Sequence, residues 1–335
     1  MHILVLGAAG MVGRKLTERL LRDGRLGERE ITRMTLQDVV APAKPVNATI
    51  PISIVTSDFA DPATAAPLVA HRPEVIFHLA AIVSGEAEAE FDKGYRINLD
   101  GTRHLIEAIR NAGDGYKPRL VFTSSIAVFG APFPEKIGDE FFQTPLTSYG
   151  TQKLICELLI NDYTRKGLLD GISIRLPTIC VRPGKPNKAA SGFFSNILRE
   201  PLAGEEAILP VSDDVRHWHA SPKSAVGFLV HAGTMDLSAV GARRNLSMPG
   251  LSATVGEQIA ALDRVAGKKV VARIKRVPDP TIISIVSGWP RDFVTGRALK
   301  LGFTTAEKTF DDIIRIHIED ELGGKFAGQI DIGRS

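Results

Sequence analysis

Short apolar runs alternate with longer amphipathic stretches through the first half of the chain. An apolar run without polar alternation is typical of a strand buried on both faces, and helices between such strands indicate a parallel sheet covered on both sides. We therefore predict an α/β fold built on a doubly wound parallel sheet. The predicted strands are Ile3–Leu6, Met34–Leu36, Ile52–Val55, Val75–Leu79, Leu120–Phe122 and Ile172–Leu176, and the predicted helices are Met11–Arg22, Ala63–His71, Asn98–Asn111 and Tyr149–Lys166.

The alternation weakens after about Pro183, where prolines and glycines punctuate the chain. We assign residues 1–182 to a first domain that carries the sheet. Residues 183–335 are assigned mainly to a smaller C-terminal lobe, allowing for the chain to cross back to the first domain. In this second region we expect helices near Gly192–Arg199, from Pro222, near Gly256–Ala266 and near Ala306–Asp320, and strands near Asn245–Met248 and Val270–Ile274.

Bulk composition narrows the class of protein. The 335 residues are 44% hydrophobic, which is ordinary for a globular protein. The net charge is +3, and acidic and basic residues are interspersed, so nucleic acid is not an implied partner. No apolar run is long enough to span a bilayer, so we expect no membrane partner. The cysteines, Cys156 and Cys180, lie in apolar runs and offer no disulfide framework, which predicts a reducing, cytoplasmic location.

The stretch ILVLGAAGMVGRKL reads as a strand, a glycine turn and the start of a helix. Its glycines, Gly7, Gly10 and Gly13, have the spacing G-x-x-G-x-x-G. A dinucleotide site requires glycines here because the backbone must approach the pyrophosphate and the helix must pack closely on the strand. The N–H groups at the helix N-terminus then face the phosphates. We predict that this loop, including Met11 and Val12, binds a dinucleotide; the alternative is an ordinary turn.

An acidic residue follows the second predicted strand. In a dinucleotide-binding sheet, an acid at this position accepts hydrogen bonds from the adenine-ribose hydroxyls. Asp38 is the candidate, and its charge would repel the extra phosphate of NADP. No arginine follows it immediately, so we predict NAD as the cofactor. The alternative is a solvated loop aspartate, because its spacing from Gly13 is longer than in the usual fingerprint.

The stretch SYGTQKLICE opens a predicted helix with Tyr149 and Lys153 at i and i+4. Residues four apart lie on the same face of a helix, so the two side chains can project into one small volume. An ammonium beside a phenol favours the phenolate and lowers its pKa, which would make Tyr149 usable as an acid or base. By itself the pair favours an ordinary amphipathic helix with a half-buried tyrosine and a solvated lysine, because i, i+4 pairs are common on helix surfaces.

Seven stretches of the chain resemble the extended short-chain dehydrogenase/reductases, a family that includes nucleotide-sugar epimerases and dehydratases. They are GAAGMVG, SDFADP, VIFHLAA, NLDGTRHLIEA, VFTSSIAVFG, SYGTQKLICE and IRLPTICVRPG, and they occur in the family's order. The resemblance implies a Rossmann-type fold, an NAD cofactor and a C-terminal substrate-binding lobe. Family members are commonly dimers through two helices of each subunit, so a homodimer is expected.

The resemblance also implies roles for individual residues. Asp58 and Phe59 would flank the adenine, and Asn98 would hold the helix that supports the active site. Ser125, Tyr149 and Lys153 would be the catalytic residues, with Lys153 also holding the nicotinamide ribose. Further cofactor contacts are implied for Leu79, Ala80, Ala81, Pro177, Thr178 and Ile179.

The chemistry of these side chains agrees with alcohol oxidation. Oxidation requires removal of the hydroxyl proton while a hydride leaves the carbon. Tyr149 can take the proton, and Ser125, at the end of a core strand, can bind and orient the same oxygen. Alone, Ser125 is better interpreted as a strand-end hydroxyl that satisfies nearby backbone groups; its place beside Tyr149, Lys153 and the glycine loop favours the catalytic role.

The C-terminal lobe should select the substrate. Nucleotide-sugar members usually carry a stretch like R-D-[YFW]-x-H-V-x-D. Here Arg216 and Trp218 match, whereas His217 and Lys223 stand in place of the aspartates. The surrounding loops are similar to the D-erythronate dehydrogenase branch of the family, whose members oxidise a four-carbon sugar acid at C2 with NAD. The resemblance therefore implies a small sugar acid, with a nucleotide-diphosphate-sugar epimerase or dehydratase as the alternative.

A small hydroxy acid requires a cation for its carboxylate and polar groups for its hydroxyls. The fork of an arginine suits a carboxylate, so Arg182 and Arg216 are candidates, with Ser84 and Asn196 as hydroxyl partners. A surface ion pair is the alternative for each arginine. His217 and His219 are spaced like a metal pair, but no third ligand lies at a sensible spacing, so we expect no metal.

Overall fold

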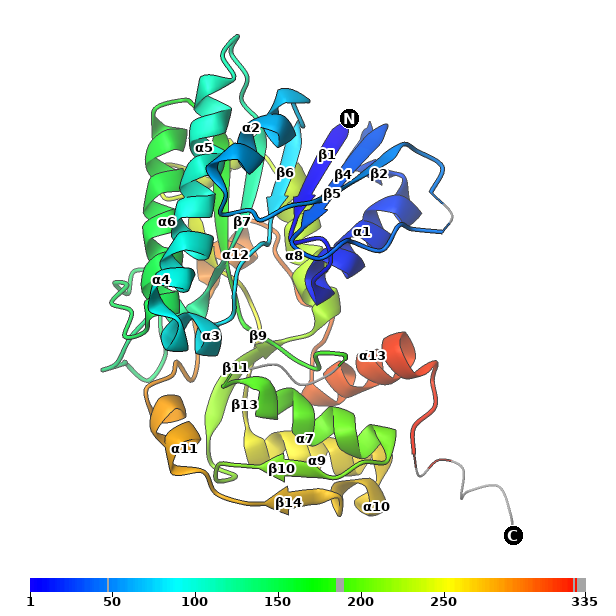
Figure 1. Ribbon diagram of the computed structural model, residues 1–335. Coiled ribbons are helices and arrows are strands. Elements are labelled where there is room, and N and C mark those ends of the chain that lie inside the picture. The colour runs from blue at the N-terminus through cyan, green and yellow to red at the C-terminus, as the bar shows by residue number, and fades with distance from the viewer. Residues whose placement is uncertain (47, 185–189, 328, 330–335) are drawn as a thin grey trace.

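A seven-stranded parallel sheet forms the centre of the molecule (Figure 1). The computed structural model describes residues 1–46, 48–184, 190–327 and 329. The strand order, β5–β4–β1–β6–β7–β8–β12, reverses direction between β1 and β6, which is the point where doubly wound folds bind ligands. Its strands are β1 (His2–Leu6), β4 (Arg33–Asp38), β5 (Ile52–Thr56), β6 (Val75–His78), β7 (Arg119–Ser125), β8 (Asp170–Leu176) and β12 (Asn245–Ser247).

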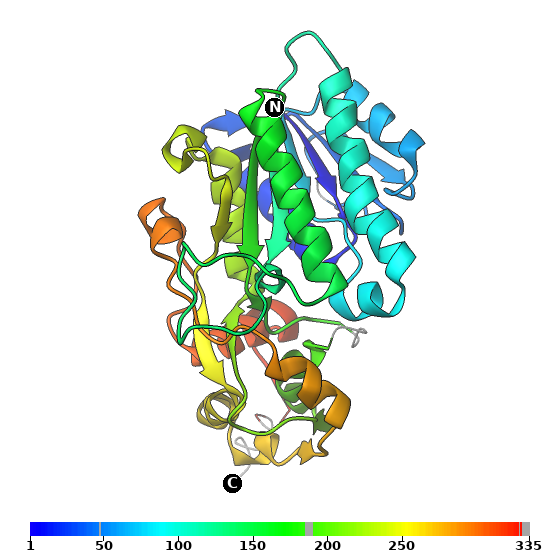
Figure 2. The same ribbon diagram turned by 90° about the vertical axis from the view of Figure 1, so that its left-hand side faces the viewer.

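Helices cover both faces of this sheet, as Figures 1 and 2 show. Their apolar sides pack against strands that are buried along almost their whole length, apart from the half-buried edge strand β5, which explains why the central strands show no polar alternation. One face carries α1 (Met11–Asp23) and α8 (Pro222–Thr234). The other carries α2 (Pro62–Ala70), α5 (Gly101–Asn111) and α6 (Ser148–Arg165). The fold class predicted from the sequence is confirmed.

A second group of elements lies beyond the carboxyl ends of the main strands. It has its own buried apolar cluster, which includes Phe194, Leu262 and Ile313. Its small sheets pair β9 (Thr178–Ile179) with β11 (Arg216–Ala220) and β13 (Leu251–Thr254), and β10 (Ala207–Leu209) with β14 (Ile274–Arg276). Its helices include α7 (Gly192–Ala203), α9 (Val255–Ala266), α10 (Lys268–Val271), α11 (Pro280–Ser287) and α13 (Phe310–Leu322).

Shorter elements complete the chain. They are β2 (Arg25–Leu26), β3 (Arg29–Glu30), α3 (Ser84–Ala89), α4 (Phe91–Gly94), the π-helix η1 (Tyr95–Asp100), the 3₁₀ turns η2 (Ile126–Val128) and η3 (Leu237–Val240), and α12 (Gly296–Lys300). The helix predicted over Asn98–Asn111 thus begins within η1 and continues as α5.

Two predicted boundaries are wrong, and each has a local cause. The strand expected at Val270–Ile274 is instead a one-turn helix followed by β14, which begins at Ile274. Val270 and Ile274 are buried, but Ala272 between them is exposed, so the burial follows the i, i+4 spacing of a helix and not the i, i+2, i+4 spacing of a strand. The final helix begins at Phe310 rather than near Ala306 because Thr309 and Asp312 form a reciprocal capping box there.

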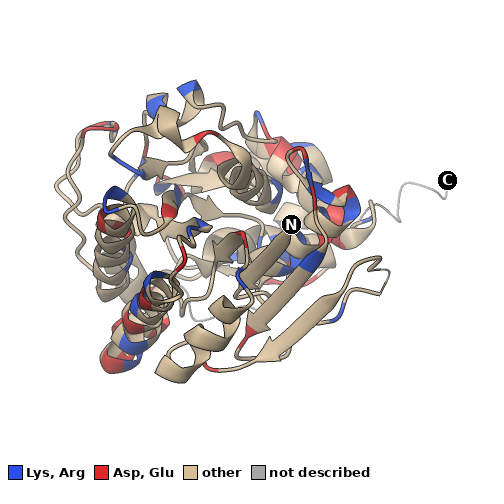
Figure 3. Ribbon diagram, turned by 90° about the horizontal axis from the view of Figure 1, so that it is seen from above, with Lys and Arg blue, Asp and Glu red and all other residues tan. Residues whose placement is uncertain are grey.

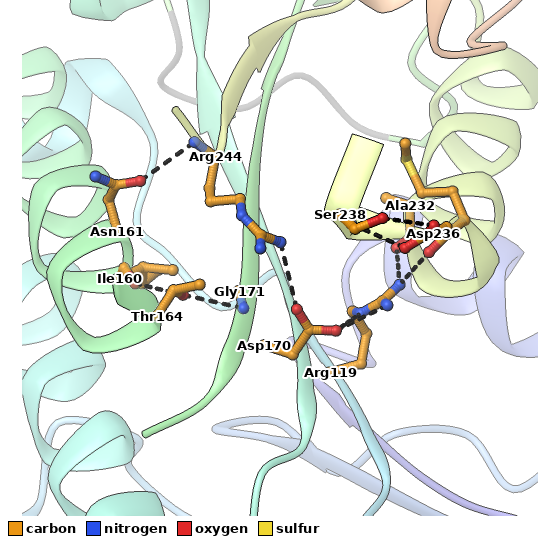
Figure 4. A network of polar contacts seen from close by, with 11 residues as sticks. Arg119, Ile160, Asn161, Thr164, Asp170, Gly171, Ala232, Asp236, Ser238 and Arg244 are labelled. Carbon is orange, nitrogen blue, oxygen red and sulfur yellow. Dashed lines mark hydrogen bonds and ion pairs between the residues drawn. The ribbon is translucent and has the colours of Figure 1, made fainter. Parts of the chain in front are cut away.

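The chain returns to the main sheet after entering the second group. Helix α8 packs on the sheet, and β12 pairs in parallel with β8 at its edge. A polar network at the far end of the sheet ties these segments together (Figure 4). There Arg119 donates to Asp170 at 2.9 Å and to the carbonyls of Ala232 and Met235 at the end of α8. Arg244, just before β12, approaches Asp170 from the other side at 3.3 Å.

Acidic and basic residues are interspersed along the outer helices (Figure 3). Recognition of a charged ligand therefore has to come from individual side chains rather than from a field of one sign. Among the helices of the described residues, none combines the length and apolar character needed to cross a bilayer.

Candidate active site

A cleft of about 720 Å³ lies between the sheet and the C-terminal lobe. The sheet contributes the carboxyl ends of β1, β6 and β7 through Gly7, Leu79 and Ser125. The lobe contributes Arg182 and the segment after α11, including Trp289. The cleft therefore lies at the point where the strand order reverses, which is the usual ligand site of such a sheet.

The glycine loop forms one end of the cleft. Gly7 has φ +83°, and a Cβ at Gly13 would lie 2.2 Å from the carbonyl oxygen of Gly7. Helix α1 follows at once, and its N-cap, Gly10, provides no side-chain hydrogen bond to the first turn. The N–H groups of that turn therefore remain available to a ligand's phosphates, so the residues present fit the pyrophosphate of a dinucleotide.

Asp38 is held beside this loop at the end of β4. Its Oδ2 accepts a hydrogen bond from the backbone N–H of Ala9 at 2.9 Å, and its Oδ1 lies 3.4 Å from the N–H of Val40. These contacts fix the carboxylate next to the phosphate loop, although Asp38 is outside the lining of the cleft itself. This is the place expected for an acceptor of ribose hydroxyls.

The other residues predicted to contact the cofactor divide into two groups. Asp58, Phe59, Ala80 and Asn98 lie outside the lining of the cleft. Asp58 is paired with Arg96 at 2.7 Å, Phe59 is buried against His78, and Asn98 is buried and donates to Gln152 on α6 at 2.8 Å. Those that line the cleft are Gly7, Gly10, Met11, Val12, Gly13, Leu79, Ala81, Tyr149, Lys153, Pro177, Thr178 and Ile179.

Tyr149 and Lys153 both face the cleft from the first turns of α6. The helix begins there because Thr147 accepts the N–H of Gly150 at 3.1 Å, and because Glu88 accepts the N–H of Ser148 at 2.9 Å. Lys153 is buried, and its Nζ donates to the carbonyl of Thr123 at 2.9 Å. The same Nζ lies 5.6 Å from the centre of the Tyr149 ring, so the spacing does bring the two side chains together.

The electrostatics of the pair differ from the expectation. Burial raises the pKa of Tyr149 to about 12, and the opposing positive charge is that of Arg182 rather than Lys153. Burial also lowers the pKa of Lys153 to about 8, and the nearby carboxylate of Glu157 opposes this shift only in part. The prediction that Lys153 lowers the tyrosine pKa is therefore wrong for the protein without ligands, because removal from water dominates for both groups.

Ser125 lies where β7 ends. Its Oγ accepts the N–H of Ala127 at 3.1 Å, so the serine's own proton is left for another acceptor. Ser125 also lines the cleft, together with Tyr149. The neighbouring Ser124 instead donates to the buried carboxylate of Glu157, which also binds Arg175 at 2.7 Å. Sequence reasoning missed this buried ion pair behind the serines.

Arg182 is a half-buried cation of the cleft; Arg199 also lines the cleft, but it is paired with Glu200. Its Nε donates to the carbonyl of Ile179 at 3.1 Å, and its Nη2 donates to Ser191 at 3.0 Å. No carboxylate among the described residues forms an ion pair with it, and burial lowers the pKa of its guanidinium. These two bonds hold the fork in place and leave further N–H groups for a ligand.

Of the remaining residues predicted to bind substrate, two line the cleft and one lies outside it. Ser84 and Asn196 line the cleft, and the carbonyl of Asn196 is taken by Arg199 at 2.8 Å. The amide N–H groups of Asn196 are thus the ones left for a ligand. Arg216 lies outside the lining and approaches Glu257 at 3.3 Å.

Several residues of the cleft were not predicted from the sequence to contact cofactor or substrate. Trp289 and Pro290 follow α11, far along the chain from the motifs, and His217 lines the cleft through contacts with Thr178 and Pro290. Its neighbour His219 is fully buried and lies 3.0 Å from the amide of Gln258. Within the described residues, no cluster of three or more His, Cys, Asp or Glu side chains could hold a metal ion.

The cleft thus combines a dinucleotide cradle, a phenol, an ammonium, a free serine proton and a cation. Comparison with known proteins identifies the family and its relatives. Residues 3–221 match the NAD dependent epimerase/dehydratase family. D-Erythronate dehydrogenase of Cupriavidus necator is 44% identical over 96% of this chain and 98% of its own length. D-Erythronate dehydrogenase of Haemophilus influenzae is 40% identical over 96% of this chain and 100% of its own length.

A solved structure is also similar along nearly the whole chain. It is that of the nucleoside-diphosphate-sugar epimerase from Agrobacterium tumefaciens, with 64% identity and a TM-score of 0.94. The match covers 97% of this chain and 95% of that one.

Proposed function

Because the chain belongs to the NAD dependent epimerase/dehydratase family, we propose that its cleft oxidises a small sugar acid, D-erythronate or a close analogue, at C2 with NAD. The curated relatives that act on D-erythronate support this substrate class. The observation that carries the proposal is Arg182. It is a half-buried guanidinium without a carboxylate partner among the described residues, and it lies close enough to Tyr149 for its charge to act on the phenol.

The residues of the cleft divide the reaction between them. Arg182 binds the substrate carboxylate, and the amide of Asn196 and the hydroxyl of Ser84 bind the remaining hydroxyls. Ser125 donates its proton to the reacting C2 oxygen and orients it, while Tyr149, as phenolate, takes the proton of that hydroxyl. NAD, when bound, supplies the acceptor for the hydride that leaves C2. The buried ammonium of Lys153 lies beside the phenol, with its Nζ 5.6 Å from the centre of the Tyr149 ring, and would hold the nicotinamide ribose.

The first test is net production of NADH. Purified protein mixed with NAD and D-erythronate should accumulate NADH, followed by absorbance, because a dehydrogenase releases the reduced cofactor. A matched reaction with D-threonate, which has the opposite configuration at one carbon, measures how strictly the cleft selects stereochemistry. Absence of NADH with both acids would contradict the proposal.

A nucleotide-diphosphate-sugar epimerase or dehydratase is the second candidate, and the name of the 64% identical structure favours it. Such an enzyme returns the hydride to its substrate and releases no NADH. Turnover of a UDP-sugar, followed by NMR, with no NADH from D-erythronate would favour this candidate over the first.

Asp38 should set the preference for NAD over NADP. Its carboxylate is fixed next to the phosphate loop, where it would repel a 2′-phosphate. We expect Asp38→Ala to lower the ratio of kcat/KM for NAD to that for NADP by roughly tenfold or more, since a charged hydrogen bond and a repulsion are both lost. Steady-state kinetics with both cofactors measure this ratio. Asp38→Asn, which keeps an acceptor without the charge, separates the two effects; an unchanged ratio in Asp38→Ala would place the selection elsewhere.

We also propose a homodimer formed through the outer face of α6. Leu158 on this helix is 59% exposed, and Phe91, on the adjoining α4, is 58% exposed. Two copies of such a face can pack as a helical bundle. Leu158→Glu should then give monomers in light scattering after gel filtration, whereas wild type gives dimers; equal masses for the two would contradict the proposal.

A cytoplasmic location fits the cysteines. Cys156 and Cys180 are both free and buried, so neither contributes a disulfide of the kind that stabilises secreted proteins.

A further inference from the structure

His217 joins two walls of the cleft that come from distant parts of the chain. Its imidazole Nδ1 lies 2.8 Å from the carbonyl oxygen of Pro290, and its Nε2 lies 2.7 Å from Oγ1 of Thr178. All three residues line the cleft. The ring itself is held by stacking on Phe194, with ring centres 5.2 Å apart and planes within 4° of parallel.

The two contacts together determine which nitrogen of His217 carries the proton. A proline carbonyl can only accept, so Nδ1 must donate to Pro290. Burial lowers the pKa of His217 to about 4, so the ring is neutral near pH 7 and carries one proton. Its Nε2 is therefore an acceptor, and the hydroxyl of Thr178 must donate to it. The lone pairs of Thr178 Oγ1 are then left for a ligand in the cleft that Thr178 lines.

We propose that His217 is a positioning residue, which turns the proton of Thr178 away from the cleft so that Oγ1 accepts an N–H or O–H from a bound ligand. Two groups could supply that donor: the carboxamide of the nicotinamide or a hydroxyl of the sugar acid. The inference rests on the proposed function for the identity of these ligands. The inference also gives a reason for His217 at the position where nucleotide-sugar enzymes usually have an aspartate. An ionised aspartate carboxylate could not donate a hydrogen bond to the Pro290 carbonyl, whereas the histidine can.

The test compares three single variants and one double variant. Thr178→Val removes the accepting oxygen and keeps the shape of the side chain. His217→Phe keeps the stacking on Phe194 and removes both hydrogen bonds. His217→Asn keeps a donor near the place of Nδ1 but has no acceptor at the place of Nε2, so it covers the case in which His217→Phe does not fold. The double variant joins Thr178→Val to whichever His217 variant folds.

Two readouts identify the ligand. NADH fluorescence titration gives Kd for the cofactor without any substrate, and steady-state kinetics give KM and kcat for D-erythronate. We expect Thr178→Val and the His217 variants to raise the same constant by roughly fivefold to tenfold, as for the loss of one hydrogen bond. A raised Kd for NADH identifies the carboxamide as donor, and a raised KM for D-erythronate identifies a substrate hydroxyl.

The double variant decides whether the two residues act together. If His217 acts through Thr178, the double variant should resemble Thr178→Val alone, because the second change removes nothing further. His219→Phe is the matched control: it also changes a buried histidine on β11 beside Phe194, but one outside the cleft. It should alter the melting temperature and leave both constants unchanged.

Either of two results would overturn the inference. One is a Thr178→Val variant with wild-type Kd and KM; the other is effects of His217 and Thr178 that multiply in the double variant. If wild type binds NADH but does not oxidise D-erythronate, the proposed function fails, and the Kd for NADH alone then decides the role of His217.

Discussion

Tyr149→Phe is expected to lower kcat/KM for D-erythronate by about 10³-fold, in line with the loss of a general base. The phenyl ring keeps its place on α6 over Lys153, so the Kd for NADH should change little. Stopped-flow and steady-state measurements of NADH production give the rate, and fluorescence titration gives Kd. Ser125→Ala is the companion variant, because it removes the other group on the same oxygen while leaving the base intact.

The pH dependence provides a second readout of the same group. Burial holds the pKa of Tyr149 at about 12, so the phenolate is the minor form at neutral pH. For a base, the active form is deprotonated, and kcat/KM should therefore rise with pH, by up to tenfold per unit below the pKa. A flat profile between pH 6 and 8, or a Tyr149→Phe variant of wild-type activity, would show that the phenol is not the base.

Arg182→Met is expected to raise KM for D-erythronate by roughly 30-fold, the usual cost of losing hydrogen bonds to a charged group. Methionine keeps much of the length of the side chain but lacks the charge and the donors. The Kd for NADH should be little affected if Arg182 binds only the substrate. Initial rates over a range of D-erythronate concentrations, in wild type and variant, measure the effect.

Two further arginine variants test whether Arg182, and not Arg216, binds the substrate carboxylate. Arg182→Lys keeps the charge but loses the planar fork, so its KM should fall between those of wild type and Arg182→Met. Arg216→Met removes the other arginine predicted from the sequence, which is already near Glu257 outside the cleft. If KM rises in Arg216→Met and not in Arg182→Met, the carboxylate is bound by Arg216 and our assignment is wrong.

The placements that could be predicted from the sequence are local ones. The glycine loop, Asp38 and the Tyr149–Lys153 pair each depend on a strand end or on spacing within one helix, where backbone geometry fixes the outcome. The buried strands were equally clear because both faces of the sheet are covered.

The features that could not be predicted from the sequence depend on contacts between residues far apart along the chain. His217 meets Pro290 only because β11 and the segment after α11 fold against each other, and nothing near His217 in the sequence indicates this partner. The pKa of Tyr149 depends on how much water the folded cleft excludes, which spacing does not record. Arg182 and Arg216 were equivalent candidates in the sequence. Their surroundings in the fold distinguish them, because Arg182 has no carboxylate partner among the described residues and Arg216 lies beside Glu257.

The return of α8 and β12 to the main sheet has a consequence for how such enzymes can diversify. Because these segments lie in the chain among those that build the lobe, no single recombination point separates cofactor binding from substrate choice. A gene exchange that replaced everything after residue 182 would also replace β12, the edge strand paired with β8, and α8, whose end is hydrogen-bonded to Arg119. New specificities in this architecture should therefore arise by piecemeal change of residues lining the cleft rather than by shuffling whole halves.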